Sequence, residues 1–184
     1  MEFLVELWLP ILVGAVALWF LSVLAWVVLP HHFGDFSKLE NEDELMSHLK
    51  NLESGNYMFP HAGSNKVQGS KEYQQQYAEG PRGTLNVYEV PNMAVNMALT
   101  ICYFLVTSLT IAYITNVACP AGDAATDFLK VFRIAGTIGV LTYASSGVLN
   151  RIWFKAKMWT DMLDGAVYGV VLGLVFAALW NYAA

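Results

Sequence analysis

The chain is short of charged residues, cysteines and catalytic motifs. Charged residues make up 14% of its 184 positions and hydrophobic residues 56%, which is more apolar than a soluble domain usually is. A net charge of −5, without a basic stripe carrying interleaved aromatics, argues against a nucleic-acid partner. The composition and length predict a single integral membrane domain over residues 1–184, with the lipid bilayer as its main partner.

The two cysteines, Cys102 and Cys119, are too few for a disulfide framework. Both lie on or near one predicted helix, where their spacing corresponds to roughly 25 Å, beyond the reach of a disulfide. The sequence therefore excludes an intrachain disulfide if that helix forms.

Motifs that carry known chemistry are also missing. The chain has no phosphate-binding glycine loop, nucleophile elbow, HExxH, paired CxxC or haem-attaching CxxCH. It also lacks the glycine- or proline-broken pair of spans and the mid-membrane charge typical of a transport path. These absences predict a protein that is not an enzyme and carries no cofactor.

Long apolar runs dominate what is present. Residues 7–29 hold no charge and are long enough to cross about 30 Å of hydrocarbon, while the acids before them argue against a signal peptide. Further spans are predicted at about 93–117, 128–149 and 162–182. We therefore expect an all-α membrane protein, a bundle of four transmembrane helices with a loop insertion at 30–92.

The basic residues predict an orientation. Arg151, Lys155 and Lys157 crowd the link between the third and fourth spans, whereas the link before the third span holds Asp123 and Asp127 without a base. The positive-inside bias places the basic link and the 30–92 insertion in the cytoplasm, so both termini face outside.

The insertion should have elements of its own. Residues 41–55 predict a short helix with Asn41 as its cap, and residues 70–81 repeat the pattern from a Ser70 cap to a Gly80 stop. Residues 84–90 alternate like a strand, for which the sequence shows no partner.

Glycines recur in the fourth span at strict four-residue spacing. A stripe of small residues lets another helix backbone approach closely in lipid. The third span offers a matching small face, so the two spans should form a tight antiparallel hairpin. The residues assigned to this packing are Gly165, Gly169, Gly173, Ala135 and Gly139.

All four histidines fall in the predicted insertion, which raises a metal hypothesis with His31, His32 and His61 as ligands and Asp35 as an oxygen donor. Adjacent histidines on a helix project about 100° apart, so His31 and His32 could share an ion only with an unusual backbone. We favour the simpler interpretation, in which this pair lies at the headgroup level and binds no metal.

Asp161 and Asp164 open the fourth span. Acids within a membrane span are functional by default, but a first-turn position and the nearby lysines would stabilise them cheaply. We therefore expect Asp161 to cap the helix and Asp164 to complete the capping arrangement.

Several segments, in order, resemble one family. They are LPHH after the first span, NEDEL, YMFPH, GPRGTLNV, PNM before the second span, VFRIAGT in the third and MLDGAVYG in the fourth. Together they resemble a family of small uncharacterised bacterial inner-membrane proteins. The resemblance implies a bacterial source and the same four-span layout, and it supplies no catalytic residues.

Two functions remain open. The favoured one is a non-enzymatic membrane scaffold or accessory subunit that assembles as a homo-oligomer or within a larger membrane complex. The alternative is a metal- or haem-binding membrane protein that uses its interfacial histidines.

Overall fold

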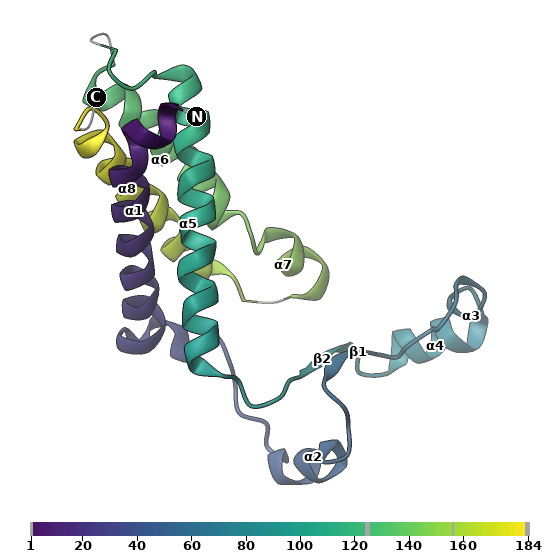
Figure 1. The fold of residues 1–184 in the computed structure, drawn as a ribbon. Coiled ribbons are helices and arrows are strands. Elements are labelled where there is room, and N and C mark those ends of the chain that lie inside the picture. The colour runs from purple at the N-terminus through teal and green to yellow at the C-terminus, as the bar shows by residue number, and fades with distance from the viewer. Residues whose placement is uncertain (1, 124–125, 156, 183–184) are drawn as a thin grey trace. The chain divides into compact units, whose positions relative to one another are not determined.

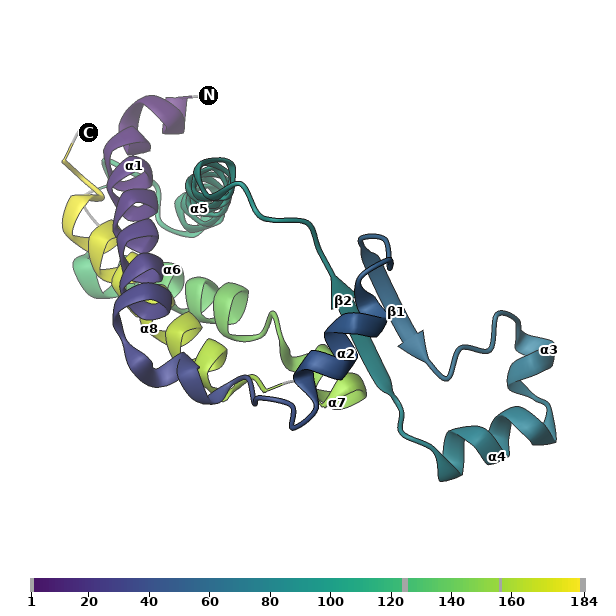
Figure 2. The ribbon, with the colours of Figure 1, turned by 90° about the horizontal axis from the view of Figure 1, so that it is seen from below.

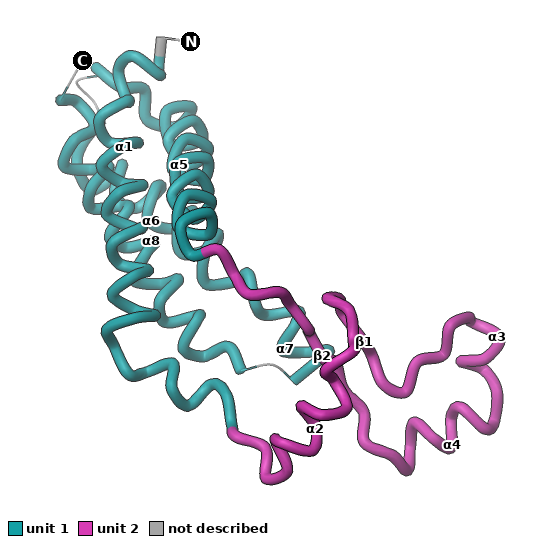
Figure 3. The backbone as a smooth tube through the Cα atoms, turned by 60° about the horizontal axis from the view of Figure 1, so that its bottom comes forward, with its two compact units in different colours: residues 1–37, 93–184 teal, residues 38–92 magenta. Residues whose placement is uncertain are grey.

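The structure is a computed structural model that describes residues 2–123, 126–155 and 157–182. The chain divides into two compact units, Met1–Ser37 with Met93–Ala184 and Lys38–Asn92. Figure 3 draws the first unit in teal and the second in magenta. The boundary assigns residues 30–37 to the helical unit, although the sequence had suggested that the insertion begins at residue 30.

Four segments of the first unit are long and apolar enough to cross a membrane: Phe3–Val28, Met93–Ala118, Phe128–Phe154 and Trp159–Leu179. Their main helices are α1 (Glu2–Val23), α5 (Met93–Ala118), α6 (Phe128–Ala144) and α8 (Trp159–Leu179), as Figure 1 shows. A mostly helical chain with four candidate membrane helices is thus confirmed.

The ends of these segments differ from the predicted spans. The third helix stops at Ala144, and a turn leads into the short helix α7 (Val148–Phe154). The fourth begins at Trp159, three residues before the predicted start, with Met158 at the cap position and no side-chain cap. The prediction that Asp161 caps this helix is therefore wrong.

The helices of the first unit pack through two kinds of contact. Helix α1 lies against α5 and α8, and α8 lies against α6 (Figure 2). Apolar side chains fill the interior, with Leu7, Leu18, Ile111, Leu172 and Phe176 all almost fully buried. Polar contacts also join these segments. Thr107 of α5 and Tyr143 of α6 share a 2.8 Å hydrogen bond, and Trp180 Nε1 donates to the Cys119 carbonyl.

Glycines line the contact between α6 and α8. A Cβ placed on Gly169 would lie 2.1 Å from the backbone nitrogen of Val140, and one on Gly165 would lie 2.5 Å from that of Ala144. Gly173 faces Gly136 in the same way, and a Cβ placed on Gly173 would lie 2.8 Å from the Cα of Gly136. The two backbones are therefore so close that no side chain fits between them.

The five residues assigned to packing from the sequence lie on α6 and α8, and one further residue, Gly136, belongs to the contact between these helices. Gly139 lies opposite Gly169, and Ala135 is fully buried. Gly136, which the spacing of the glycines in the fourth span did not indicate, is the residue opposite Gly173.

The second unit contains α2 (Glu42–Leu49), β1 (Gly55–Phe59), α3 (Asn65–Gln68), α4 (Lys71–Glu79) and β2 (Gly83–Val87). The Ser70 side chain caps α4 by accepting a hydrogen bond from the Tyr73 amide, whereas Asn41 makes no such bond to α2. Strand β2 pairs antiparallel with β1, with Gly55 opposite Val87. The predicted strand thus has a partner that the sequence did not reveal.

Candidate metal centre

The chain leaves the first span through two irregular turns. A π-helix, Leu24–Val28, ends the span, Leu29 is extended, and a 3-10 turn follows at Pro30–Gly34. Pro30 suits the first position of that turn because its missing N–H would have no partner there. π-helical segments are rare, and single π-helical turns within α-helices are frequently found at functional sites.

These turns bring two consecutive histidines onto one carboxylate of α8. His31 Nε2 lies 2.9 Å from Asp164 Oδ1, and His32 Nε2 lies 2.9 Å from Asp164 Oδ2. The two imidazole rings are 4.3 Å apart. An α-helical backbone would direct the two side chains about 100° apart, so this convergence depends on the change of backbone after Val28.

A second carboxylate holds His32 from the other side. Asp35 Oδ2 lies 2.6 Å from His32 Nδ1 and also accepts a 2.8 Å hydrogen bond from the Thr160 hydroxyl. Trp26 stacks on the His32 ring, with 3.9 Å between centroids and an interplanar angle of 11°. The position and tilt of His32 are therefore fixed by Trp26 on one face of the ring and by a carboxylate at each nitrogen.

The cluster lies at the end of the bundle but is shielded from solvent. His32 is 5% exposed and Asp164 is 9% exposed. A carboxylate with so little access to water needs compensating hydrogen bonds or charge, which the two histidines provide. Near it, Lys157 donates a hydrogen bond to the Gly34 carbonyl, so the segment before α8 is tied to the 3-10 turn.

Two titratable groups of the cluster, His32 and Asp35, lie outside the candidate spans, and the pKa of each is shifted by its contacts. Burial alone would lower the pKa of His32, but the hydrogen bonds and charges of Asp164 and Asp35 outweigh it, and the pKa is raised. Hydrogen bonds from His32 and Thr160 lower the pKa of the Asp35 carboxyl. Both shifts favour a protonated histidine beside an ionised aspartate.

The contacts constrain where protons can be. His32 donates its Nδ1 proton to Asp35. The contact between His32 Nε2 and Asp164 Oδ2 then also needs a proton, which is carried either by Nε2 or by the carboxyl group. One atom each from His31, His32 and Asp164 also lies within 4.8 Å of the others, which is compatible with ligation of one metal ion. The cluster can therefore hold shared protons or a cation in their place.

The sequence had named three of these four residues and given the fourth another role. His31, His32 and Asp35 were candidate ligands, but the pair was expected at the headgroup level without a buried partner. Asp164 was expected to belong to the start of α8, yet it lies in the second turn and bonds both histidines. The remaining candidate, His61, lies exposed in the other unit.

No protein-family model matches the chain, and no curated protein or solved structure matches it either. The resemblance to small bacterial inner-membrane proteins therefore stays a prediction, and the geometry of the cluster carries the functional argument.

Proposed function

We propose that the protein is a membrane-embedded binding protein for a divalent transition metal ion, with zinc as the best-fitting ion. The observation that carries the proposal is the convergence of two imidazole Nε2 atoms on the two oxygens of one buried carboxylate. His31, His32 and Asp164 would be the ligands.

The ligand set suits this class of metal. Two imidazole nitrogens and one carboxylate form a common set for Zn²⁺ and for non-haem Fe²⁺, whereas Ca²⁺ and Mg²⁺ prefer oxygen ligands. Metal-binding histidines usually donate their other ring N–H to a carboxylate or carbonyl, which fixes the tautomer. Asp35 occupies that position on His32 Nδ1, at 2.6 Å.

Haem fits the cluster less well. With rings 4.3 Å apart, His31 and His32 leave no room for a porphyrin between them, and both Nε2 atoms are directed at Asp164. We therefore favour a single metal ion over haem as the ligand of this site.

Metal analysis of the purified protein tests the proposal directly. Protein purified in detergent, loaded with zinc and desalted, should retain about one metal ion per chain, and His31→Ala, His32→Ala or Asp164→Asn should abolish retention. His48→Ala and His61→Ala are matched controls because both histidines are exposed and lie in the other unit. Retention unchanged in the cluster variants, or lost equally in the controls, would overturn the proposal.

We further propose that the protein is a multi-pass protein of a bacterial inner membrane with both termini outside. The four apolar helices and the basic link around Arg151 support this placement. Assembly as a scaffold, accessory subunit or homo-oligomer stays a prediction. Because α6 already occupies the glycine stripe of α8, a partner helix would need another face.

A further inference from the structure

A small cavity adjoins the cluster on the side of α5 and α6. It has a volume of about 180 Å³ and combines aromatic rings with carboxylates. Its lining includes Tyr103, Phe104, Tyr143, Tyr168, Asp161 and Asp164. The volume accommodates a group of a few heavy atoms and is too small for a lipid chain.

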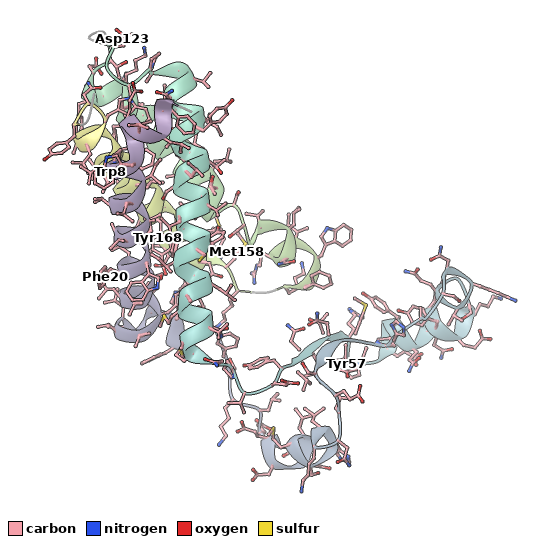
Figure 4. The ribbon with its side chains drawn as sticks, in the orientation of Figure 1. Trp8, Phe20, Tyr57, Asp123, Met158 and Tyr168 are labelled. Carbon is pink, nitrogen blue, oxygen red and sulfur yellow. The ribbon has the colours of Figure 1, made fainter. Side chains whose placement is uncertain are left out.

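Three pairs of rings around this cavity stand nearly perpendicular to each other. Tyr168, labelled in Figure 4, lies 6.0 Å from Phe104 at 89° and 6.1 Å from Tyr143 at 79°. Tyr103 lies 6.3 Å from Tyr143 at 75°. Edge-to-face contacts of this kind make the rings stable walls whose electron-rich faces can attract a cation.

Two polar groups of the cavity have no hydrogen-bond partner within the described part of the chain. Asp161 lies in the first turn of α8 and makes no hydrogen bond there, although its carboxylate interacts through space with the charges of His32, Asp35 and Asp164. The Tyr168 hydroxyl oxygen is buried and unpaired among the same residues. Buried polar atoms are nearly always hydrogen-bonded, so an unpaired hydroxyl beside a cavity points to a ligand that supplies the bond.

From these features we propose that the cavity binds the ammonium group of a small organic amine, either free or as the headgroup of a phospholipid. The aromatic faces and Asp161 attract the positive charge, and the Tyr168 oxygen accepts an N–H. Asp164 lines the cavity as well, but the proposal does not depend on metal at the cluster. A neutral or anionic group would gain from neither the rings nor the carboxylates.

Thermal unfolding of the full chain in a maltoside detergent tests this proposal. Ethanolamine should raise the unfolding midpoint in a saturable manner, whereas 1-propanol, which replaces the ammonium by a methyl group, should leave it unchanged. A short-chain phosphatidylethanolamine and its N-acetyl derivative make the same comparison for a lipid headgroup. Stabilisation by the lipid alone would identify a headgroup site, and stabilisation by ethanolamine as well would show that the free amine suffices.

Variants separate the cavity from general charge effects. Asp161→Asn should weaken ethanolamine binding about tenfold or more, the usual effect of losing one charge-assisted hydrogen bond. Tyr168→Phe keeps the ring and should weaken binding by a smaller factor. Asp43→Asn, the same change at an exposed residue of the other unit, should have no effect. Equal shifts with 1-propanol, no shift with any amine, or unchanged binding in Asp161→Asn would overturn the proposal.

Discussion

At the scale of single residues, Asp164 is the position on which the cluster depends. Its two oxygens contact two different histidines, and the carboxylate is nearly removed from water. From the sequence, the change Asp164→Asn would cost roughly 1 kcal/mol or less, through the helix dipole alone. The contacts in the structure indicate a larger cost.

We expect Asp164→Asn to lower the free energy of unfolding by about 2–3 kcal/mol, because it removes the charge from one buried and one partly buried hydrogen bond. Thermal or denaturant unfolding in detergent, without metal, measures the change. Asp161→Asn serves as the control, since Asp161 has no hydrogen-bond partner among the described residues and its loss should change stability little. Equal effects of the two variants would contradict the structural role given to Asp164.

The pKa shifts of His32 and Asp35 predict a pH window for the metal-free protein. The raised pKa of His32 stabilises the fold fully below its ordinary value of 6.5, and this contribution is lost as pH rises through the raised pKa. The lowered pKa of Asp35 stabilises the fold above its ordinary value of 3.8, and this contribution is lost as pH falls through the lowered pKa. Stability from the pair should therefore be greatest between about pH 4 and 6.5.

Unfolding midpoints measured across that range with a chelator present test the window. In His32→Gln the loss of stability on the alkaline side should disappear, because glutamine does not titrate. The affinity for metal should have the opposite pH dependence and should increase as pH rises, because the metal ion competes with protons for the imidazole nitrogens. An alkaline limb that persists unchanged in His32→Gln would assign the titration to another group.

At the scale of elements, the paired helices α6 and α8 were the easiest feature to predict. Four-residue glycine spacing is a local pattern, and its physical meaning, close backbone approach, does not depend on the rest of the chain. The partner positions were harder, since Gly136, the contact of Gly173, was not among the residues assigned to packing from the sequence. Which residues of α6 meet the stripe depends on the position of the two helices along each other, which spacing alone does not determine.

The glycine stripe of α8 predicts that substitutions at two adjacent positions, Gly169 and Val170, have very different effects on stability. Gly169→Ala should destabilise the protein by about 1–3 kcal/mol or more as overpacking, because even a Cβ would lie 2.1 Å from the Val140 nitrogen. Val170→Leu should be nearly silent, since Val170 is 42% exposed. Thermal stability in detergent compares the two variants. Equal midpoints would show that the helices separate easily at this point.

The irregular ends of the spans were not predictable from local pattern. Residues 24–28 continue the apolar run without a break, yet they form a π-helix, and the 3-10 turn follows immediately after Leu29. The short sequence GNYMF gave no alternation to identify β1 as the partner of β2. In both cases the backbone is decided by contacts with distant residues, which a local window does not contain.

At the scale of the whole molecule, the candidate site is assembled from opposite ends of the chain. His32 and Asp164 are 132 positions apart and meet because α1 packs on α8. The histidines and the acid could be recognised in the sequence as separate features, and no motif spacing links them. Tertiary packing of the first and last spans creates the site, so its residues could be listed from sequence but not grouped.

The prediction for the whole molecule is its orientation in the membrane, with the link before α6 outside the cell and the basic link after it inside. In a variant whose native cysteines are replaced by alanine, a membrane-impermeant thiol reagent applied to intact cells should label Asp123→Cys and spare Asn150→Cys. Both positions are exposed: Asp123 lies in the link before α6, and Asn150 lies in the short helix α7, between α6 and α8. Disrupted cells should label both, which controls for reactivity. The reverse pattern in intact cells would invert the topology.

The stacking of Trp26 on His32 gives the protein an optical reporter of its own. An excited indole transfers an electron readily to a protonated imidazole and poorly to a neutral one, so stacking at 3.9 Å couples Trp26 emission to the ring's charge. Loss of the His32 proton, to base or to an incoming ion, should therefore brighten this one tryptophan. Occupancy of the cluster then becomes readable in the native chain, without a label, as a change in total tryptophan emission, to which Trp26 contributes as one of six tryptophans.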